Sequence, residues 1–137
     1  MPVRKVVATK EAPVPVGPYS QAVITADKVF TAGQLGIDPA TGKLVGEGVE
    51  EQTRQSLRNL QAVLTAAGTS LENTVKVTVF LTDMAAFPLM NRVYAEFFPK
   101  DPPARTCIGV AALPMGAAAE IEAVAVLPAR GISRGPA

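Results

Sequence analysis

Apolar residues recur along the chain with two periods, the two-residue period of strands and the three- to four-residue period of helices. Residues 75–82 are nearly all β-branched or apolar, which predicts a central strand. Three shorter segments, 3–8, 20–24 and 28–32, alternate more weakly and predict preceding strands, the first of them at a sheet edge. Between residues 33 and 48 we expect a loop, because Asp-Pro and Thr-Gly pairs in this segment are turn signals.

Two stretches carry apolar residues at helical spacing. The first runs from Glu50 to Ala67 and precedes Gly68, a residue suited to end a helix. Its stripe consists of Thr53, Leu57, Leu60, Leu64 and Ala67. The second begins after Asp83, whose side chain suits an N-cap, and stops before Pro99. Its buried side is expected to hold Phe87, Met90, Tyr94, Phe97 and Phe98.

The stretch from Pro103 to Val126 predicts two more strands joined by a loop, and each strand carries charge where an apolar residue is expected. Side chains alternate along a strand, so Arg105 shares a face with Cys107, and Glu120 shares a face with Glu122. The opposite faces hold Thr106, Ile108 and Val110 in the first strand and Ile121, Ala123 and Ala125 in the second. Arginine and glutamate are rarely fully buried without a partner, so both charges need an explanation.

One explanation is a structural ion pair, or two charges on the solvated face of a hairpin. Three features favour a functional site instead. Arg105 follows Pro102 and Pro103 and therefore lies at a strand entrance. Cys107, the only thiol of the chain, is expected beside it. Gly116 and the three alanines after it remove side-chain bulk before Glu120, which leaves room for a small ligand.

The order of elements predicts an α+β fold in which two helices cover one face of a mixed sheet. We expect a single domain over residues 1–128 and a loose tail over 129–137, where two glycines and a proline interrupt any period. No third layer is available for the other face of the sheet. Oligomerisation would cover that face, and a hydrophobic content of 48% with a mean hydropathy of +0.25 agrees with apolar surface in subunit contacts.

Composition excludes several classes of function. A net charge of +1 provides no field that would attract nucleic acid or an acidic membrane, and no apolar run approaches the length of a membrane span. One cysteine and no histidine exclude the usual zinc ligand sets and any imidazole base, so neither a metal nor a cofactor is expected. The N-terminal segment has no apolar core of an export signal, so a cytoplasmic location is expected.

Several blocks of the chain resemble the RidA/YjgF family of imine and enamine deaminases. The blocks are PARTCIGVAALP with AEIEAVA, GPYSQAV at 17–23, GQLGIDPATGKLV at 33–45, QTRQSLRNLQAVLTAAG at 52–68 and VKVTVFLTDMAAFPLMNRVYAEFF at 75–98. The resemblance covers roughly residues 3 to 128. It implies a chorismate-mutase-like fold assembled as a homotrimer, with three clefts at the subunit interfaces.

The resemblance also implies a set of substrate-binding residues, which are Tyr19, Gly33, Asn91, Arg105, Cys107 and Glu120. Arg105 is suited to bind the carboxylate of a small 2-imino acid bidentately. Glu120 would deprotonate a water that attacks the C=N carbon and would then return the proton to nitrogen, which yields a 2-oxo acid and ammonia. Apolar walls are expected to raise the pKa of Glu120, and Arg105 is expected to lower it.

Simpler interpretations exist for the other four positions. Tyr19 would serve packing, Gly33 a turn and Asn91 the polar surface, while Cys107 lacks a histidine to activate it as a nucleophile. The chain also departs from the family pattern at Ala32, Gly36 and Ala118. A roomier site that accepts larger imines is expected from these three residues.

Two other functions compete with the deaminase. A non-catalytic module that binds or senses 2-oxo acids would need Arg105 alone, whereas hydrolysis also needs Glu120, and the presence of both favours the enzyme. An endoribonuclease or translation inhibitor would need a basic groove that follows phosphates. The scattered basic residues Arg54, Arg58 and Lys76 do not indicate such a groove.

Overall fold

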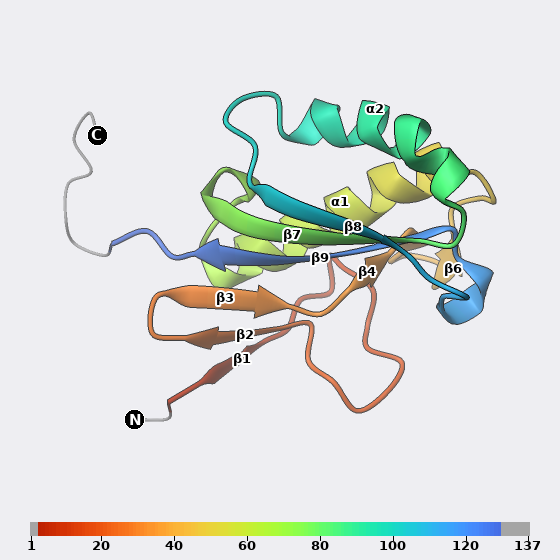
Figure 1. Ribbon diagram of the computed structural model, residues 1–137. Helices are drawn as coiled ribbons and strands as arrows, with labels where there is room; N and C mark the ends of the chain where they lie inside the picture. Colours follow the sequence, from red (N-terminus) through yellow and green to blue (C-terminus); the bar gives the residue numbers. More distant parts are fainter. Residues whose placement is uncertain (1–2, 130–137) are drawn as a thin grey trace.

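Seven strands form one mixed sheet, and two helices pack on one of its faces in the computed structural model, which describes residues 3–129 (Figure 1). In chain order, the strands of this sheet are β1 (Lys5–Val7), β2 (Ala22–Thr25), β3 (Lys28–Thr31), β4 (Gln34–Leu35), β7 (Thr74–Leu81), β8 (Ala104–Gly109) and β9 (Ala119–Val126). The spatial order is β1-β2-β3-β9-β7-β8, and β4 also pairs with β9. Within the described residues β7 and β8 run parallel and the other paired strands are antiparallel. The α+β class predicted from the sequence is therefore confirmed.

Helix α1 (Val49–Ala67) matches the predicted helix to within one residue. Its first turn carries Glu50 and Glu51, which suit the positive end of the helix dipole, and a Glu51 Oε1 accepts a hydrogen bond from the Gly48 amide at 2.9 Å. Gly68 ends the helix with φ +96°, a left-handed conformation that favours glycine. The predicted stripe faces the core, where Thr53 and the three leucines are buried.

The segment 33–48 is not the plain loop expected from its turn signals. Besides β4, it contains a small separate sheet of β5 (Ile37–Asp38) and β6 (Lys43–Leu44). Two polar side chains of α1 hold it in place. Asn59 Nδ2 donates to the carbonyl oxygens of Leu35 and Ile37 at 3.0 and 2.9 Å, and Gln52 Nε2 donates to that of Gly46 at 2.8 Å. Strands of two residues are too short to show a period, so the pattern missed them.

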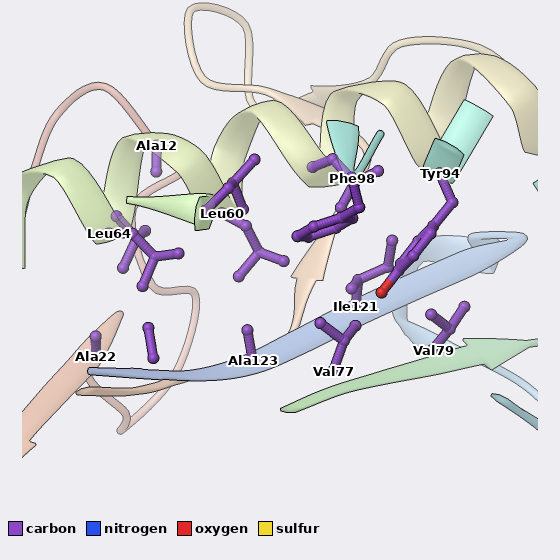
Figure 2. Close-up of a cluster of buried hydrophobic side chains, with 14 of the residues drawn as sticks. Ala12, Ala22, Leu60, Leu64, Val77, Val79, Tyr94, Phe98, Ile121 and Ala123 are labelled. Atoms are coloured by element: carbon purple, nitrogen blue, oxygen red, sulfur yellow. The ribbon is translucent and has the colours of Figure 1, made fainter. Parts of the chain in front are cut away.

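Helix α2 (Phe87–Phe97) begins later than predicted, because a 3₁₀ turn (Met84–Ala86) precedes it. Asp83 Oδ1 accepts a hydrogen bond from the Ala85 amide at 2.9 Å and thus caps the 3₁₀ turn rather than α2 itself. Figure 2 shows how Tyr94 and Phe98 pack with α1 against the strands. Met90, Tyr94 and Phe98 are buried, whereas Phe87 and Phe97 are half-buried.

The two faces of the sheet differ in cover. Val77, Val79 and Ile121 face the helices and are fully buried. On the opposite face, Phe30 is 43% exposed and Ile108 is 42% exposed. Neither helix of residues 3–129 packs on this face.

The predicted tail falls mostly outside the described part of the chain. Residue 129 is exposed and has no regular structure, and residues 130–137 lie outside the described residues. The three remaining sheet predictions hold with small shifts: the first strand is an edge strand, the second begins two residues later than expected, and the central strand begins one residue earlier.

Candidate functional site

The register of the sheet places Arg105 and Glu120 on opposite faces. Arg105 is aligned with Val77 in the pairing of β8 with β7, and Glu120 is aligned with Phe80 in the pairing of β9 with β7. Aligned residues project from the same face, and Val77 faces the helices whereas Phe80, three residues on, faces away. The two charged side chains therefore do not meet within one chain, and the expected effect of Arg105 on the pKa of Glu120 does not arise there.

Glu120 lies in a cavity of about 290 Å³ on the side of the sheet away from α2. The cavity also contains Tyr19 and Gly33, two of the residues predicted from the family resemblance. Apolar groups make up most of the remaining wall, which includes Pro13, Val14, Val16, Leu35, Ile37 and Met115. These wall residues were not among those predicted, because nothing in their spacing connects them before the chain folds.

Gly33 is fitted to the carboxyl group of Glu120. A Cβ atom at this position would lie 2.8 Å from the carboxyl carbon and 2.9 Å from Oε2, which is closer than real contacts allow. The absence of a side chain at Gly33 therefore lets the carboxylate occupy its place in the cavity. The turn-glycine interpretation does not explain this contact, and the backbone-approach interpretation does.

The Glu120 carboxyl group has an unusual electrostatic environment. Burial, and then the negative charge of Glu122 on the same face of β9, raise its pKa above the ordinary value. Within residues 3–129 no side chain donates a hydrogen bond to the Glu120 carboxyl group or forms an ion pair with it. A carboxylate with a raised pKa and no protein donor is suited to take a proton from a water or a substrate.

Tyr19 is half-exposed, and its hydroxyl oxygen accepts a hydrogen bond from the Val16 amide at 3.3 Å. This bond fixes the ring next to the cavity while leaving the O–H group able to donate. Simple burial in the core does not describe this residue, because 49% of it is exposed.

Arg105 lies under α2, among side chains of that helix. The Cζ atom lies 4.7 Å from the centroid of the Tyr94 ring and 5.4 Å from that of Phe87, and Nη1 lies 4.0 Å from the sulfur of Met90. Three ion pairs occur in the described part of the chain, and neither Arg105 nor Glu120 takes part in them. The structural ion-pair interpretation is therefore wrong for residues 3–129, where the guanidinium charge has no acidic partner.

Cys107 follows Arg105 on the same face of β8 and is half-buried. Burial raises the pKa of the thiol, and the Arg105 charge only partly opposes this effect. The thiol is therefore protonated near neutral pH, in agreement with the interpretation that it is not an activated nucleophile. Asn91 follows Met90 on α2, and its Oδ1 is buried with no hydrogen-bond partner in the described part of the chain.

Five of the predicted residues thus fall into two groups on opposite faces of the sheet, which are candidate half-sites. We call Tyr19, Gly33 and Glu120 the acid half-site, and Arg105 with Cys107 the arginine half-site. Asn91 is on α2 next to Met90, the residue whose sulfur contacts Arg105. Sequence reasoning placed Tyr94, Phe87 and Met90 in the core stripe but missed that they also surround the guanidinium. A spacing of seven residues between Phe87 and Tyr94, two helical turns, was the available signal.

Of the three departures from the family pattern, only Ala32 lines the cavity. A Cβ atom at Gly36 would lie 2.6 Å from the Cα atom and the carbonyl oxygen of Gln52, so this glycine permits close packing against α1. Ala118 donates its amide to Gln52 Oε1 at 2.7 Å and belongs to the same framework. Of the three residues, only Ala32 can therefore make the cavity roomier than the family pattern implies.

The described residues give little support to other kinds of site. No group of three or more His, Cys, Asp or Glu side chains in residues 3–129 is placed to hold a metal ion. None of the helices described there is long and apolar enough to cross a membrane. Arg54 pairs with Glu96 at 2.9 Å and Lys76 donates to Thr106 Oγ1 at 2.7 Å, so these basic residues do not line a groove together.

A family profile described as Endoribonuclease L-PSP matches residues 9–127. The chain belongs to this family. It is the RidA/YjgF family of the sequence blocks quoted above, and the match covers both half-sites.

Members of the RidA/YjgF family are similar to this chain in sequence and in structure. The bovine 2-iminobutanoate/2-iminopropanoate deaminase is 48% identical over 124 residues, which are 90% of each protein. The crystal structure of RidA from the Antarctic bacterium Psychrobacter sp. has a TM-score of 0.87 and 41% identity, with 90% of this chain and 99% of that chain covered. The crystal structure of E. coli TdcF with bound serine has a TM-score of 0.87 and 42% identity over the same shares.

Proposed function

We propose that the protein hydrolyses reactive 2-imino acids and their enamine tautomers to 2-oxo acids and ammonia. The observation that carries the proposal is a pair of complementary groups without partners in the described chain, the Arg105 guanidinium and the Glu120 carboxyl group of raised pKa. The first is suited to bind a carboxylate and the second to move a proton. The name of the bovine relative, a 2-iminobutanoate/2-iminopropanoate deaminase, supports the same reaction.

We further propose that the protein works as a homotrimer with three sites at the subunit interfaces. The two half-sites lie on opposite faces of one sheet, so a substrate of a few atoms needs the arginine half-site of one copy and the acid half-site of a neighbour. The partly exposed apolar residues Phe30 and Ile108 on the uncovered sheet face support an association of copies. Residues 1–128 would form the repeating domain, and we expect the protein to act in the cytoplasm.

The proposed reaction begins with bidentate binding of the substrate carboxylate by Arg105. Glu120 takes a proton from water while the water oxygen forms a bond to C2, and the C=N electron pair moves to the nitrogen, which takes up a proton from solvent. The resulting carbinolamine collapses to the 2-oxo acid when its hydroxyl proton is lost to solvent, the C–N bond breaks, and Glu120 returns its proton to the nitrogen, which leaves as ammonia. One carboxyl group serves both steps because the two transfers occur in sequence.

The test of the reaction uses imines generated in situ by an amino-acid oxidase. We expect the wild-type protein to accelerate release of 2-oxo acid and ammonia, and Arg105→Ala and Glu120→Gln to lose at least about a hundredfold of that rate. Both variants should retain the wild-type melting temperature to within a few degrees. Wild-type activity in Glu120→Gln would contradict the role of this carboxyl group.

A mixing experiment tests the shared site. An equal mixture of Arg105→Ala and Glu120→Gln chains, refolded together, should regain about a quarter of the wild-type activity, because a quarter of the interfaces then combine an intact Arg105 with an intact Glu120. Either variant refolded alone is the control and should stay inactive. If the mixture is as inactive as the controls, the site does not combine these residues from two copies.

A binding or sensing module is the second candidate, because the arginine half-site alone could hold a 2-oxo acid. The serine in the structure of E. coli TdcF is a small carboxylate of this kind. Binding of 2-oxobutanoate that depends on Arg105, without acceleration of imine hydrolysis, would favour this candidate. Ribonuclease activity is third, and strongly salt-dependent RNA binding would support it.

A further inference from the structure

The guanidinium of Arg105 is held by aromatic rings rather than by an acid. Its Cζ atom lies 4.7 Å from the centroid of the Tyr94 ring and 5.4 Å from that of Phe87, within the range of cation–π contacts. The sulfur of Met90, one turn of α2 away from each ring, adds a third contact at 4.0 Å from Nη1. All three side chains come from one helix, and Arg105 reaches them from the edge strand β8.

This mode of support leaves the binding edge of the guanidinium available. A guanidinium has five N–H donors in its plane and none on its two faces. An acidic neighbour would occupy some of these donors and neutralise the charge, whereas a ring stacks on a face and uses no donor. No carboxylate in residues 3–129 pairs with Arg105, and only Nη1 contacts a side-chain acceptor, the sulfur of Met90, so the other donors are available to an incoming carboxylate.

The Tyr94 ring is itself firmly placed. It is buried, and it packs on the Phe98 ring with centroids 4.7 Å apart. Figure 2 shows its hydroxyl pointing from α2 toward the strands. The hydroxyl oxygen has no hydrogen-bond partner in the described part of the chain, and burial raises the pKa of Tyr94 to about 12, so the phenol stays neutral. The ring, and not the hydroxyl, is therefore the part of Tyr94 that can act on Arg105.

We propose that Tyr94 and Phe87 are positioning residues that orient Arg105 for the substrate carboxylate through cation–π contacts. This inference rests on the proposed function in one respect, that Arg105 binds a carboxylate. The aromatic residues of α2 would then have two roles, because they pack in the core and also hold the guanidinium of Arg105 in its binding orientation.

The decisive experiment changes the electron density of the ring while keeping its shape. Tyr94 is replaced by phenylalanine and by phenylalanines with one, two and three fluorine atoms, and binding of 2-oxobutanoate is measured by calorimetry together with KM and kcat for imine hydrolysis. Tyr94→Phe should bind within about twofold of wild type, and affinity should fall stepwise with fluorination to a total of about three- to thirtyfold. KM should rise in parallel and kcat should change much less, because carboxylate binding is shared by ground state and transition state.

Conventional variants provide the matched controls. Tyr94→Leu and Phe87→Leu should each weaken binding by about three- to thirtyfold. Phe98→Leu removes a ring from the same cluster that stacks on Tyr94 but not on Arg105, and it should lower the melting temperature while leaving affinity within about twofold. If Tyr94→Leu does not fold, Phe87→Leu, at a half-buried position, and the fluorinated series carry the test.

The outcomes separate this inference from the proposed function. If the wild type binds 2-oxobutanoate through Arg105 but hydrolyses no imine, the proposed function fails and the fluorine series still decides the inference. Equal affinity across the series and in Phe87→Leu overturns the inference while leaving hydrolysis intact. The same loss of affinity in Phe98→Leu as in Tyr94→Leu would assign the effect to core packing, and absence of Arg105-dependent binding would overturn the inference as well.

Discussion

The two half-sites differ in what holds their charged group in place, which is side chains in one and main chain in the other. The arginine half-site depends on side chains of α2, because two rings and a sulfur hold the guanidinium from β8. The acid half-site depends on backbone, because Glu120 fits against the bare main chain of Gly33. A flexible cation thus receives its orientation from packing, whereas a short carboxylate receives its position from a close main-chain contact. We expect the two halves to respond to different kinds of substitution.

Among the substitutions that test this comparison, Gly33→Ala in the acid half-site should have the largest effect. The new Cβ atom would lie 2.8 Å from the carboxyl carbon of Glu120, so the carboxylate has to move. A displacement of about 1 Å at a catalytic group costs on the order of a hundredfold in rate, and we expect kcat for imine hydrolysis to fall by about that factor. The affinity of 2-oxobutanoate, which depends on Arg105, should change much less.

Gly17→Ala is the matched control for this substitution. A Cβ atom at Gly17 would make only ordinary contacts, at 3.7 Å from the ring of Tyr19, so this variant should keep kcat within about threefold. Full activity of Gly33→Ala would show that the contact with the main chain does not set the position of Glu120.

A second substitution tests whether the framework under the acid half-site is separate from α2. Asn59→Ala removes the two hydrogen bonds from α1 to the carbonyl oxygens of Leu35 and Ile37, which line the same cavity as Glu120. We expect the free energy of unfolding to fall by about 1–3 kcal/mol, because buried carbonyl groups lose their donors. Denaturation in urea measures this change, and binding of 2-oxobutanoate at low temperature should persist.

Gln55→Ala provides the comparison. Gln55 donates to Asn59 Oδ1 at 2.9 Å from a half-buried position, and its loss leaves both bonds to the segment 35–37 in place. We therefore expect a loss of less than about 1 kcal/mol. Equal losses in the two variants would mean that Asn59 acts through Gln55 rather than through the carbonyl groups.

Much of this contrast could be predicted from the sequence within single elements. Alternation correctly separated Arg105 and Cys107 from Thr106 and Ile108, because the two-residue period of a strand is a local property. The helical period correctly placed Met90 and Tyr94 in the core. Only the family resemblance connected Tyr19 and Gly33 with Glu120, since these residues are about a hundred positions apart.

The relation between elements could not be predicted in this way. The alignment of β8 and β9 with β7 decides whether Arg105 and Glu120 project from the same face of the sheet or from opposite faces. Alternation within a single strand does not reveal that alignment. The contact of Arg105 with Tyr94 has the same origin. An aromatic residue in a helical stripe has the same pattern whether its ring meets an aliphatic neighbour or a guanidinium.

The smallest expected effect concerns the charge next to Glu120, a feature of the acid half-site alone. Glu120 acts as a base when it is deprotonated, so activity should fall as the pH drops through its raised pKa. Glu122→Gln removes the second cause of that rise and leaves burial, the larger one, in place. The acidic limb of the kcat profile should therefore move to lower pH but stay above the position expected for an ordinary glutamate, because burial remains.

Glu72→Gln is the matched control. Glu72 is exposed on the 3₁₀ turn Leu71–Asn73, so this variant changes the net charge equally and should leave the acidic limb unmoved. A shift of the same size in both variants would assign it to net charge, and the arginine half-site, which lies on the other face, should bind 2-oxobutanoate equally well in all three proteins.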